Sequence, residues 1–376
     1  MGISVCIITK NESAKLEECL KALKAYNFET VVVDTGSEDD TQSVIKKYAD
    51  VGGYFEWCDD FAKARNYAAS LAGNDWILAL DSDEKIQYCD EKKLGEMLAA
   101  DEMLLGRIEL INVINSTDGV THGTESLCRL YNRKYYEFRG RIHEQIDRIQ
   151  NQPADCTRNS SSDQSSTHEA LHPADKYVSI PITVLHTGYM QDGEQRRKKT
   201  ERNIRLLKRE LEERGADPYI LYQLGKSYFM RKQYEEACRY FEEGFAFDLD
   251  PALVYVQDMV ETYGYALLNL KRYEEMLFLE QIYDAFAVSA DYIFLMGLAY
   301  MNNGRFDDAF REFIKASECR ICKVEGTNSY KALYNAGVIC ECTGKLKEAA
   351  GYYKKCGTYK PAADGLERVR KLLNKL

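Results

Sequence analysis

The chain has no long hydrophobic run and no excess of positive charge. None of its apolar stretches approaches the ~20 residues that a membrane-spanning helix needs. Its N-terminus also lacks the basic region and cleavage site of a signal peptide, so we expect a cytoplasmic protein without an integral membrane segment. With 50 Lys and Arg against 60 Asp and Glu, the formal net charge of -10 argues against a nucleic-acid binder, which needs a basic surface to neutralise phosphates.

The twelve cysteines form no recognisable zinc or disulfide pattern. They are scattered through predicted strands and helices, as at Cys6, and we interpret them as buried, reduced thiols. Cys319-x-x-Cys322 and Cys340-x-Cys342 lack histidine or cysteine partners at zinc spacing. A structural zinc site is therefore not expected.

The sequence Asp81-Ser82-Asp83 follows directly on the apolar run Trp76 to Leu80. A run this short and hydrophobic is typical of a strand buried in a sheet, so both carboxylates should lie at the sheet edge where open α/β sheets bind ligands. Two hard oxygen ligands suit Mg²⁺ or Mn²⁺ together with substrate phosphates. Alone, Asp-x-Asp equally fits a helix cap or a turn, so its context decides between these interpretations.

Two further predicted strands end in polar loops ahead of this motif. Residues 3–8 form an apolar run that leads into Thr9 to Glu12, and residues 30–33 form another that leads into Asp34. Glycine and small polar residues follow and permit a tight turn into a helix. A third strand is predicted at 53–57, with a helix behind it. This alternation predicts a mostly parallel sheet with helices on both faces, which is the α/β class.

The second half of the chain shows a different periodicity, built on small and aromatic residues. Each small pair lies twelve positions apart with an aromatic residue four positions further, as in Gly225, Ala237 and Phe241, then Gly297, Ala309 and Phe313, then Gly337, Ala349 and Tyr353. This is the pattern of tetratricopeptide repeats, in which small residues let two helices of a hairpin pack closely. A unit around Gly264 is degenerate, with Glu280 at the aromatic position. We predict an α/β domain at 1–192, a connecting helix at 193–217, and helical repeats with a capping helix at 218–376.

Four blocks of the first half resemble, in order, the signature blocks of the family 2 glycosyltransferases of the GT-A fold. The blocks are Ile7 to Glu12, Val33 to Ser37 with Asp39 and Thr41, Phe61 to Asn66, and Leu80 to Glu84. Phe138 to Glu144 and His186 to Tyr189 resemble the later blocks of one branch, whose members carry helical repeats and include enzymes that glycosylate peptides or flagellar proteins. The resemblance covers roughly the whole chain. It implies a GT-A nucleotide-sugar-binding, Rossmann-like mixed sheet followed by an all-α, tetratricopeptide-like domain.

The resemblance also implies where the donor and a divalent ion would bind. The positions assigned to the donor are Thr9, Asn11, Glu12, Asp34, Gly36, Ser37, Arg65 and Asp81. A guanidinium binds phosphate bidentately, which suits Arg65 to the leaving diphosphate; its structural alternative is a salt bridge to Asp81 or Asp60. Mn²⁺ or Mg²⁺ would be held by Asp83, with Asp81 on the ribose or the metal, and by His186. A lone histidine is more often a structural residue, so both roles stay open for His186.

Family 2 enzymes invert configuration by single displacement, and the resemblance places the catalytic base at Glu144. Many members carry Glu-Asp at this position, whereas this chain carries His143-Glu144. The structural alternative makes Glu144 a helix cap or an ion-pair partner of Arg141 or Arg148. The resemblance thus implies a metal-dependent, inverting glycosyltransferase that takes a sugar from a nucleotide-diphosphate donor, with UDP sugars commonest in the family. The concave surface of the repeats favours a protein or peptide acceptor.

Several alternatives stay open at this point. The acceptor could be a cell-surface lipid or polysaccharide. A catalytically silent nucleotide-sugar-binding scaffold would bind without transfer, although none of the core carboxylates is missing. A nucleotidyltransferase or phosphatase would need a glycine-rich phosphate loop, which Thr9 to Glu12 does not provide. The sequence does not determine the sugar, the nucleotide or the acceptor atom. It also leaves open whether the protein forms a homodimer. The polar loop Ser160 to Ser166 is predicted to be either a lid over the acceptor site or a surface insertion.

Overall fold

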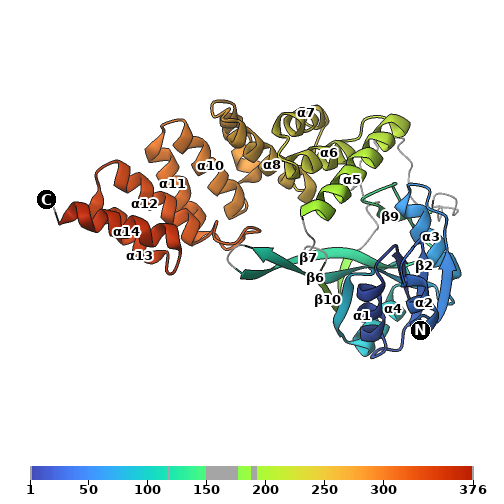
Figure 1. Ribbon diagram of the computed structural model, residues 1–376. Coiled ribbons are helices and arrows are strands. Elements are labelled where there is room, and N and C mark those ends of the chain that lie inside the picture. Colours follow the sequence, from blue (N-terminus) through green and yellow to red (C-terminus); the bar gives the residue numbers. More distant parts are fainter. Residues whose placement is uncertain (1, 117–118, 150–176, 188–192, 375–376) are drawn as a thin grey trace. The chain divides into compact units, whose positions relative to one another are not determined.

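The structure, a computed structural model, describes residues 2–116, 119–149, 177–187 and 193–374. The chain divides into two compact units, Met1–Gly215 and Ala216–Leu376 (Figure 1). The expected fold class is confirmed, because a mixed sheet with helices forms the first unit and helices alone form the second. The domain boundaries expected from the sequence stay a prediction. The loop Ser160 to Ser166 lies outside the described residues.

The first unit is built on an eight-stranded mixed sheet in the order β3-β2-β1-β4-β7-β6-β10-β5, beside a small β8-β9 hairpin. The strands are β1 (Ile3–Thr9), β2 (Glu29–Asp34), β3 (Val51–Tyr54), β4 (Trp76–Asp81), β5 (Glu84–Cys89), β6 (Leu105–Ser116), β7 (Gly119–Asn132), β8 (Tyr136–Arg139), β9 (Gln145–Arg148) and β10 (Tyr177–His186). The helices are α1 (Ser13–Leu23), α2 (Thr41–Tyr48), α3 (Phe61–Leu71), α4 (Glu91–Ala100) and α5 (Gly193–Arg214).

Strands β1 to β4 run parallel, whereas β7 is antiparallel to both of its neighbours. The third strand was predicted at 53–57, and this position is wrong, since β3 covers Val51–Tyr54. The reason lies in its partner: β3 pairs with β2 only from Val31 to Asp34, where β2 ends, and a strand without a ladder partner has nothing to hold it extended.

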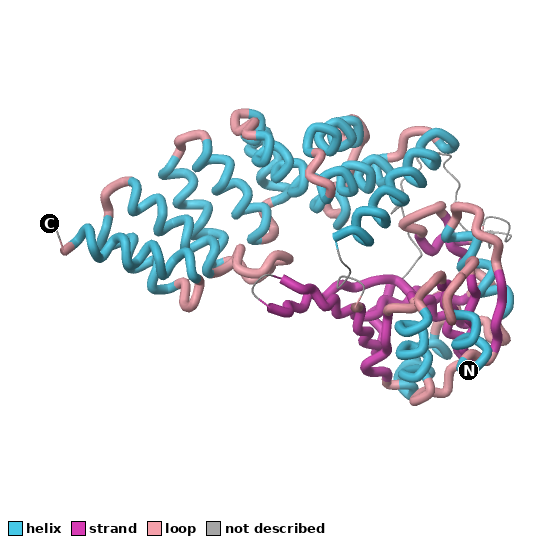
Figure 2. The backbone as a smooth tube through the Cα atoms, viewed as in Figure 1, coloured by secondary structure: helices cyan, strands magenta, loops and turns pink. Residues whose placement is uncertain are grey.

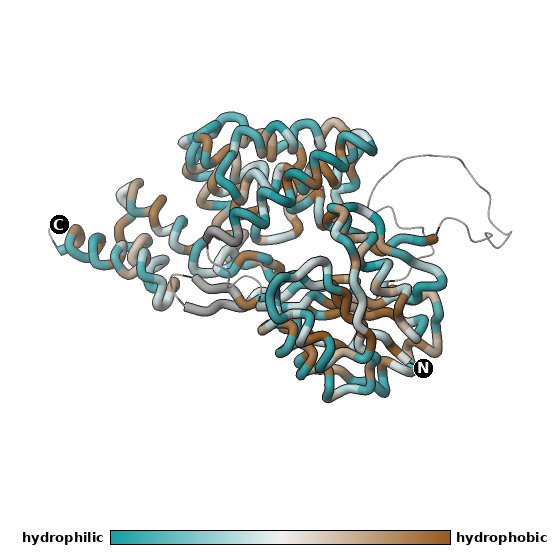
Figure 3. Tube along the Cα trace, turned by 45° about the vertical axis from the view of Figure 1, so that its right-hand side comes forward, coloured by the Kyte–Doolittle hydropathy of each residue, from teal (hydrophilic) through white to brown (hydrophobic). Residues whose placement is uncertain are grey.

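Helices cover both faces of this sheet, as the alternating pattern predicts. Leu16 and Leu20 of α1 and Leu94 and Leu98 of α4 pack into the core on one face. The alanine-rich inner side of α3 packs into the core on the other face, next to the β8-β9 hairpin. Hydrophobic residues accordingly gather along the strands, and hydrophilic ones on the outer sides of the helices (Figure 3). The core therefore fixes the strand ends, where the candidate site lies.

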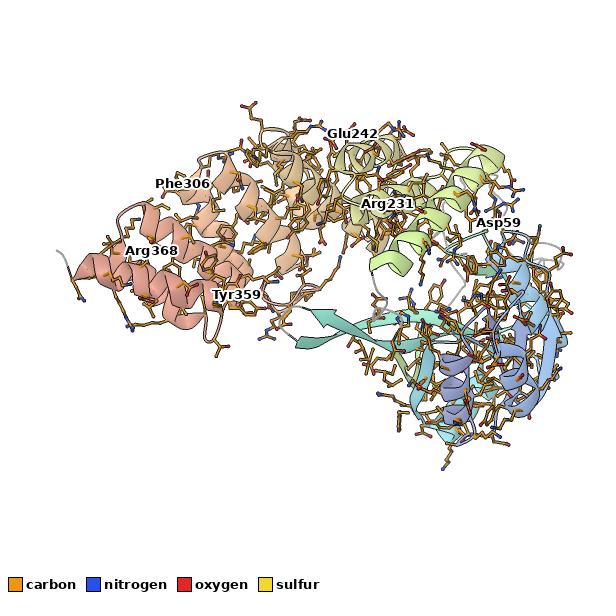
Figure 4. All side chains as sticks on the ribbon, in the orientation of Figure 1. Asp59, Arg231, Glu242, Phe306, Tyr359 and Arg368 are labelled. Atoms are coloured by element: carbon orange, nitrogen blue, oxygen red, sulfur yellow. The ribbon has the colours of Figure 1, made fainter. Side chains whose placement is uncertain are left out.

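Helix α5, the helix expected after the sheet, belongs to the first unit. The Arg205 guanidinium donates to Asp59 over 3.2 Å, and the Arg202 guanidinium lies 5.1 Å from the centre of the Phe61 ring (Figure 4 labels Asp59). Near its end, Glu213 accepts from Arg141 Nε over 2.9 Å. No helix among the described residues has the length and apolar character that crossing a membrane requires.

The second unit consists of helices stacked in hairpins (Figure 2). Its elements are α6 (Pro218–Met230), α7 (Tyr234–Gly244), α8 (Val254–Leu270), the 3₁₀ segment η2 (Glu275–Ile282), α9 (Tyr283–Phe286), α10 (Ala290–Asn302), α11 (Phe306–Glu318), α12 (Tyr330–Cys342), α13 (Leu346–Lys355) and α14 (Lys360–Leu373). Helix α14 packs on α13 at the end of the stack, where a capping helix was predicted.

The repeated glycines explain why these hairpins close tightly. A Cβ at Gly225 would lie 2.4 Å from the Phe241 ring, and one at Gly297 would lie 2.6 Å from the Phe313 ring, so each ring occupies the space that glycine leaves. The degenerate unit differs, because a Cβ at Gly264 would instead meet Leu295 of the next hairpin at 2.6 Å. In this unit η2 and the short helix α9 follow α8.

Candidate functional site

Three parallel strands bring their polar ends to one edge of the sheet. In the register of β1, Thr9 lies opposite Asp34 at the end of β2, and Ile8 lies opposite Asp81 at the end of β4. Asp83 follows two residues beyond Asp81. The carboxylates that the sequence pattern singled out therefore lie at one edge of the sheet, where open α/β sheets bind ligands.

The loops after β1 and β2 are joined by a set of short hydrogen bonds. The backbone amide of Asn11, which has a left-handed φ of 53°, donates to Ser37 Oγ over 2.9 Å, and the Glu38 amide donates to Asn11 Oδ1 over 2.7 Å. Gly36 has a φ of 101°, so the turn between Asp34 and Ser37 requires a residue without a Cβ. The structure thus brings together all the loop residues that the resemblance assigned to the donor.

Asp34 is almost fully buried, and its carboxylate is completely engaged. Its Oδ1 accepts from the Ser37 hydroxyl over 2.6 Å, and its Oδ2 accepts from Gln42 Nε2 over 3.0 Å. These bonds offset the cost of burying the charge. They also tie the end of β2 to the turn at Ser37 and to α2. Gln42 was not singled out from the sequence, because nothing in its local pattern distinguishes it from a surface residue of α2.

Asp83 and His186 face each other across the site. The His186 Nε2 lies 3.6 Å from Asp83 Oδ2, while its Nδ1 lies 2.7 Å from Asn112 Oδ1. Burial disfavours the charged imidazole, but the carboxylate of Asp83, together with Glu84 and Asp81, raises the pKa of His186 above its ordinary value. A side chain that holds the far nitrogen of a histidine is a common device for orienting a metal-binding imidazole. Asn112 is a residue that sequence reasoning missed.

This pair fits a divalent ion with two protein ligands. A carboxylate and a neutral imidazole are suitable donors for Mn²⁺, and a hard ion usually completes its coordination with substrate phosphates and water. Lys15 Nζ lies 3.8 Å from Asp83 Oδ2 and 3.1 Å from Glu12 Oε1, so the site already attracts a cation. Within the described part of the chain, no group of three or more His, Cys, Asp or Glu residues could hold a metal ion. The metal roles of Asp83, His186 and Asp81 stay predictions.

Asp81 is held by two arginines. Its Oδ1 accepts from Arg65 Nη2 over 2.6 Å, and its Oδ2 accepts from Arg129 Nη2 over 3.2 Å. Although burial opposes ionisation, these two guanidinium groups keep the pKa of Asp81 well below its usual range. The structural alternative for Arg65, a salt bridge to Asp81, is therefore present. Arg65 Nη1 is buried and has no hydrogen-bond partner among the described residues.

Glu144 lies in the loop between β8 and β9 and also contacts Arg65. Its Oε1 accepts from Arg65 Nε over 2.5 Å, and both side chains are nearly buried, with 11% of Glu144 and 7% of Arg65 exposed. The ion-pair partner is thus neither Arg141 nor Arg148. Asn66, next to Arg65, fixes this region by exchanging two hydrogen bonds with the backbone of Phe138. His143, in the same loop, has a left-handed φ of 53°.

Arg129 is the most important residue that the sequence interpretation missed. It lies on β7 and also donates to Glu84 Oε1 over 2.9 Å. Burial and the neighbouring Asp81 raise the pKa of Glu84, against the effect of Arg129. The one available signal was an arginine inside the strand-like run Leu127-Cys128-Arg129-Leu130-Tyr131, where a buried charge requires a partner.

A separate cavity of about 370 Å³ lies beside this loop. It is formed by the start of α3, the end of β8 with the turn after it, and the last turns of α5. Its charged side chains pair with one another, as in Arg141 with Glu213 and Arg214 with Glu210. None of the residues assigned to the donor lines it.

Comparisons with known proteins find matches in both halves of the chain. The model of the family described as glycosyl transferase family 2 matches residues 4–142, and the tetratricopeptide repeat model matches residues 218–250. The TPR repeat-containing protein Synpcc7942_0270 of Synechococcus elongatus is 28% identical over 244 residues, which are 64% of this chain and 56% of that protein.

A second relative is the SPbeta prophage-derived glycosyltransferase SunS of Bacillus subtilis, 26% identical over 244 residues, which are 64% of this chain and 52% of that protein. An uncharacterised glycosyltransferase of Rickettsia bellii is 30% identical over 146 residues, 38% of this chain and 49% of that protein. The chain matches only about half the length of these curated relatives.

Proposed function

We propose that this chain, in which a family 2 glycosyltransferase domain is followed by tetratricopeptide repeats, transfers a sugar from a nucleotide-diphosphate donor to a protein or peptide acceptor. The observation that carries the proposal is the meeting of three strand ends with the Asp83 and His186 pair, 3.6 Å apart. Such an edge offers buried hydrogen-bonding loops for a nucleoside and a place for phosphates beside it.

The donor side is supported by the chemistry of the residues at this edge. The loops that contain Asn11, Asp34 and Ser37 present a rigid polar surface to a base and a ribose, with UDP as the proposed nucleotide. Asp83 and His186 would hold Mn²⁺ or Mg²⁺, which when bound would stabilise the departing diphosphate. Arg65 would contact the same phosphates through Nη1, the nitrogen without a partner among the described residues. Asp81 would keep Arg65 in this orientation.

The proposed mechanism is inverting, with Glu144 as the base. Glu144 takes the proton from the acceptor nucleophile, the nucleophile forms its bond to the anomeric carbon, and the bond from that carbon to the diphosphate oxygen breaks. Glu144 Oε1 is engaged by Arg65, whereas Oε2 accepts no hydrogen bond within the described residues. The pairing with Arg65 orients the carboxylate.

The proposed polypeptide acceptor is supported by the second unit. Stacked helical hairpins form extended concave surfaces that suit a peptide chain. Lys226 of α6, whose side chain is 42% exposed, pairs with Asp258 of α8 over 2.8 Å, next to the buried Tyr222. The exposed parts of Lys226 and Asp258 would supply charged contacts to a polar segment. A lipid or polysaccharide acceptor and a silent sugar-nucleotide-binding scaffold are the outcomes against which the proposal is tested.

The test is a screen of nucleotide sugars by thermal shift with Mn²⁺, followed by a transfer assay with the selected donor. A ligand at a hundred times its dissociation constant adds about 2.7 kcal/mol of stability, which such a screen detects. Asp83→Ala should abolish the metal-dependent part of the shift and turnover. Asp75→Ala, at the opposite end of β4, is the matched control and should behave like wild type. Full wild-type activity in a chelator would overturn the metal assignment, and donor binding without any transfer would favour the silent scaffold.

A further inference from the structure

Five charged side chains form a continuous chain through the candidate site, in the order Glu144, Arg65, Asp81, Arg129, Glu84. Successive contacts measure 2.5, 2.6, 3.2 and 2.9 Å. Charges alternate along this chain, so each arginine lies between two carboxylates. Both arginines and Glu84 are nearly buried, whereas the Asp81 side chain is 38% exposed. Asp81 is thus the most exposed of the three inner members.

Arg129 is placed by the strand order of the sheet. Strand β7 pairs with β4 at three positions, and the last of these places Leu78 opposite Leu130. Arg129 is therefore the first residue of β7 beyond the paired positions. It therefore lies beside the end of β4, where Asp81 leaves the sheet. A single nitrogen, Nη2, donates to both Asp81 and Glu84. Its Nε is buried and has no partner among the described residues.

Glu84 is the last member of this chain of charged side chains. Its side chain is 2% exposed, and its Oε2 accepts from the Asp81 backbone amide over 2.9 Å. Without Arg129, the buried carboxylate of Glu84 and the half-buried one of Asp81 would lie close together with only Arg65 to compensate their charges. Such an arrangement is costly, because like charges repel strongly where water is excluded. Asp81 would then be driven to turn outward.

We propose that Arg129 is a positioning residue that keeps Asp81 turned toward Arg65 and away from the divalent ion, so that Asp83 and His186 remain the metal ligands. The inference rests on the proposed function, because it assumes that the ion binds at this edge. Arg129 holds Asp81 by its Oδ2, and Arg65 holds it by its Oδ1, so both oxygens are directed toward guanidinium groups. Asp81 serves instead to fix the guanidinium that faces the diphosphate.

The test measures Mn²⁺ affinity in the donor-free, full-length protein by calorimetry, so that it does not depend on turnover. Arg129→Gln removes a positive charge near the site and releases Asp81, and we expect Mn²⁺ to bind roughly ten-fold more tightly. In the variant that also carries Asp81→Asn, this gain should disappear. Asp81→Asn alone should change the affinity little. Arg107→Gln, on the neighbouring β6 with its guanidinium stacked on Tyr177, is the control and should match wild type.

Two results would overturn the proposal. If the gain in Mn²⁺ affinity persists in the double variant, the loss of charge alone explains it and Arg129 does not position Asp81. If the wild-type protein binds no Mn²⁺, no ion is present for Arg129 to keep Asp81 away from, and the proposal is wrong. Arg129→Lys keeps the charge and guards against misfolding of the glutamine variant; it should restore wild-type affinity. A protein that binds Mn²⁺ as expected but transfers no sugar would overturn only the proposed function.

Discussion

The substitution Glu144→Gln separates the role of a proton acceptor from the role of a salt-bridge partner. Glutamine keeps the shape of the side chain, and its amide oxygen can still accept from Arg65 Nε, which now lies 2.5 Å from Glu144 Oε1. What disappears is the negative charge and the ability to take a proton. The lost charge should lower the free energy of unfolding, whereas the lost proton acceptor should lower turnover.

The expected effects on unfolding free energy and on turnover can be measured separately. A hydrogen bond to a charged group contributes roughly 1.5–3 kcal/mol and a neutral one about 0.5–1.5, so the variant should lose about 1–2 kcal/mol of unfolding free energy. A general base contributes about 10²- to 10⁴-fold in rate, so turnover should fall by that factor. Donor affinity should hardly change, since Glu144 is assigned to the acceptor proton.

The assay combines turnover, donor dissociation constant and urea unfolding on the full-length protein. Asp147→Asn is the matched control, because it makes the same chemical change three residues away on a side chain that is 58% exposed. It should leave all three quantities near wild type. Near wild-type turnover of Glu144→Gln, together with a lowered unfolding free energy, would refute the catalytic assignment. Loss of turnover in Asp147→Asn alone would move the role to that residue.

Three further predictions concern the repeats. Gly297→Ala should destabilise the second unit by about 1–2 kcal/mol in urea unfolding, because the new Cβ would lie 2.6 Å from the Phe313 ring. Gly351→Ala meets nothing within 4 Å and should stabilise it by roughly 0.5–1 kcal/mol; the same sign for both would contradict the packing argument. Burial, with Asp291 and Asp258 and against Lys323, raises the pKa of Glu261 from 4.5 to about 7. The folded state therefore binds the proton more tightly, and stability should fall by about 3 kcal/mol as the pH rises through this window. Glu261→Gln should remove that part of the pH dependence, and equal slopes for both proteins would refute it. A chain that ends at Gly215 should bind donor but fail to glycosylate a polypeptide, and undiminished transfer would leave the repeats another role.

Much of the fold could be predicted because its signals are local. Apolar runs of strand length, each followed by a polar loop, predict parallel strands whose ends meet. The spacing of Gly225 and Phe241 predicts a closely packed helical hairpin, and the structure confirms it by placing the ring in the space beside the glycine. The strand at 53–57 was misplaced because its limits depend on where β2 ends, which is a property of the neighbour.

The partners within the site could not be predicted in the same way. Arg65 and Glu144 are 79 residues apart, and Arg129 and Asp81 are 48 apart. His186 meets Asp83 because β10 lies between β6 and β5 in the sheet, an order that differs from the order along the chain. Resemblance to a family named most of these residues, but it did not state which charge faces which.

By itself, the sequence determined the α/β sheet, the repeats, and the strand ends at which Thr9, Asp34 and Asp81 emerge. These follow from hydrophobic periodicity and turn chemistry, which act over a few residues. Only the tertiary structure decided that Asp81 pairs with both Arg65 and Arg129, and that Glu144 also pairs with Arg65. The physical reason is that buried charges must find partners of opposite sign, and which partners are within reach depends on the order and register of the strands.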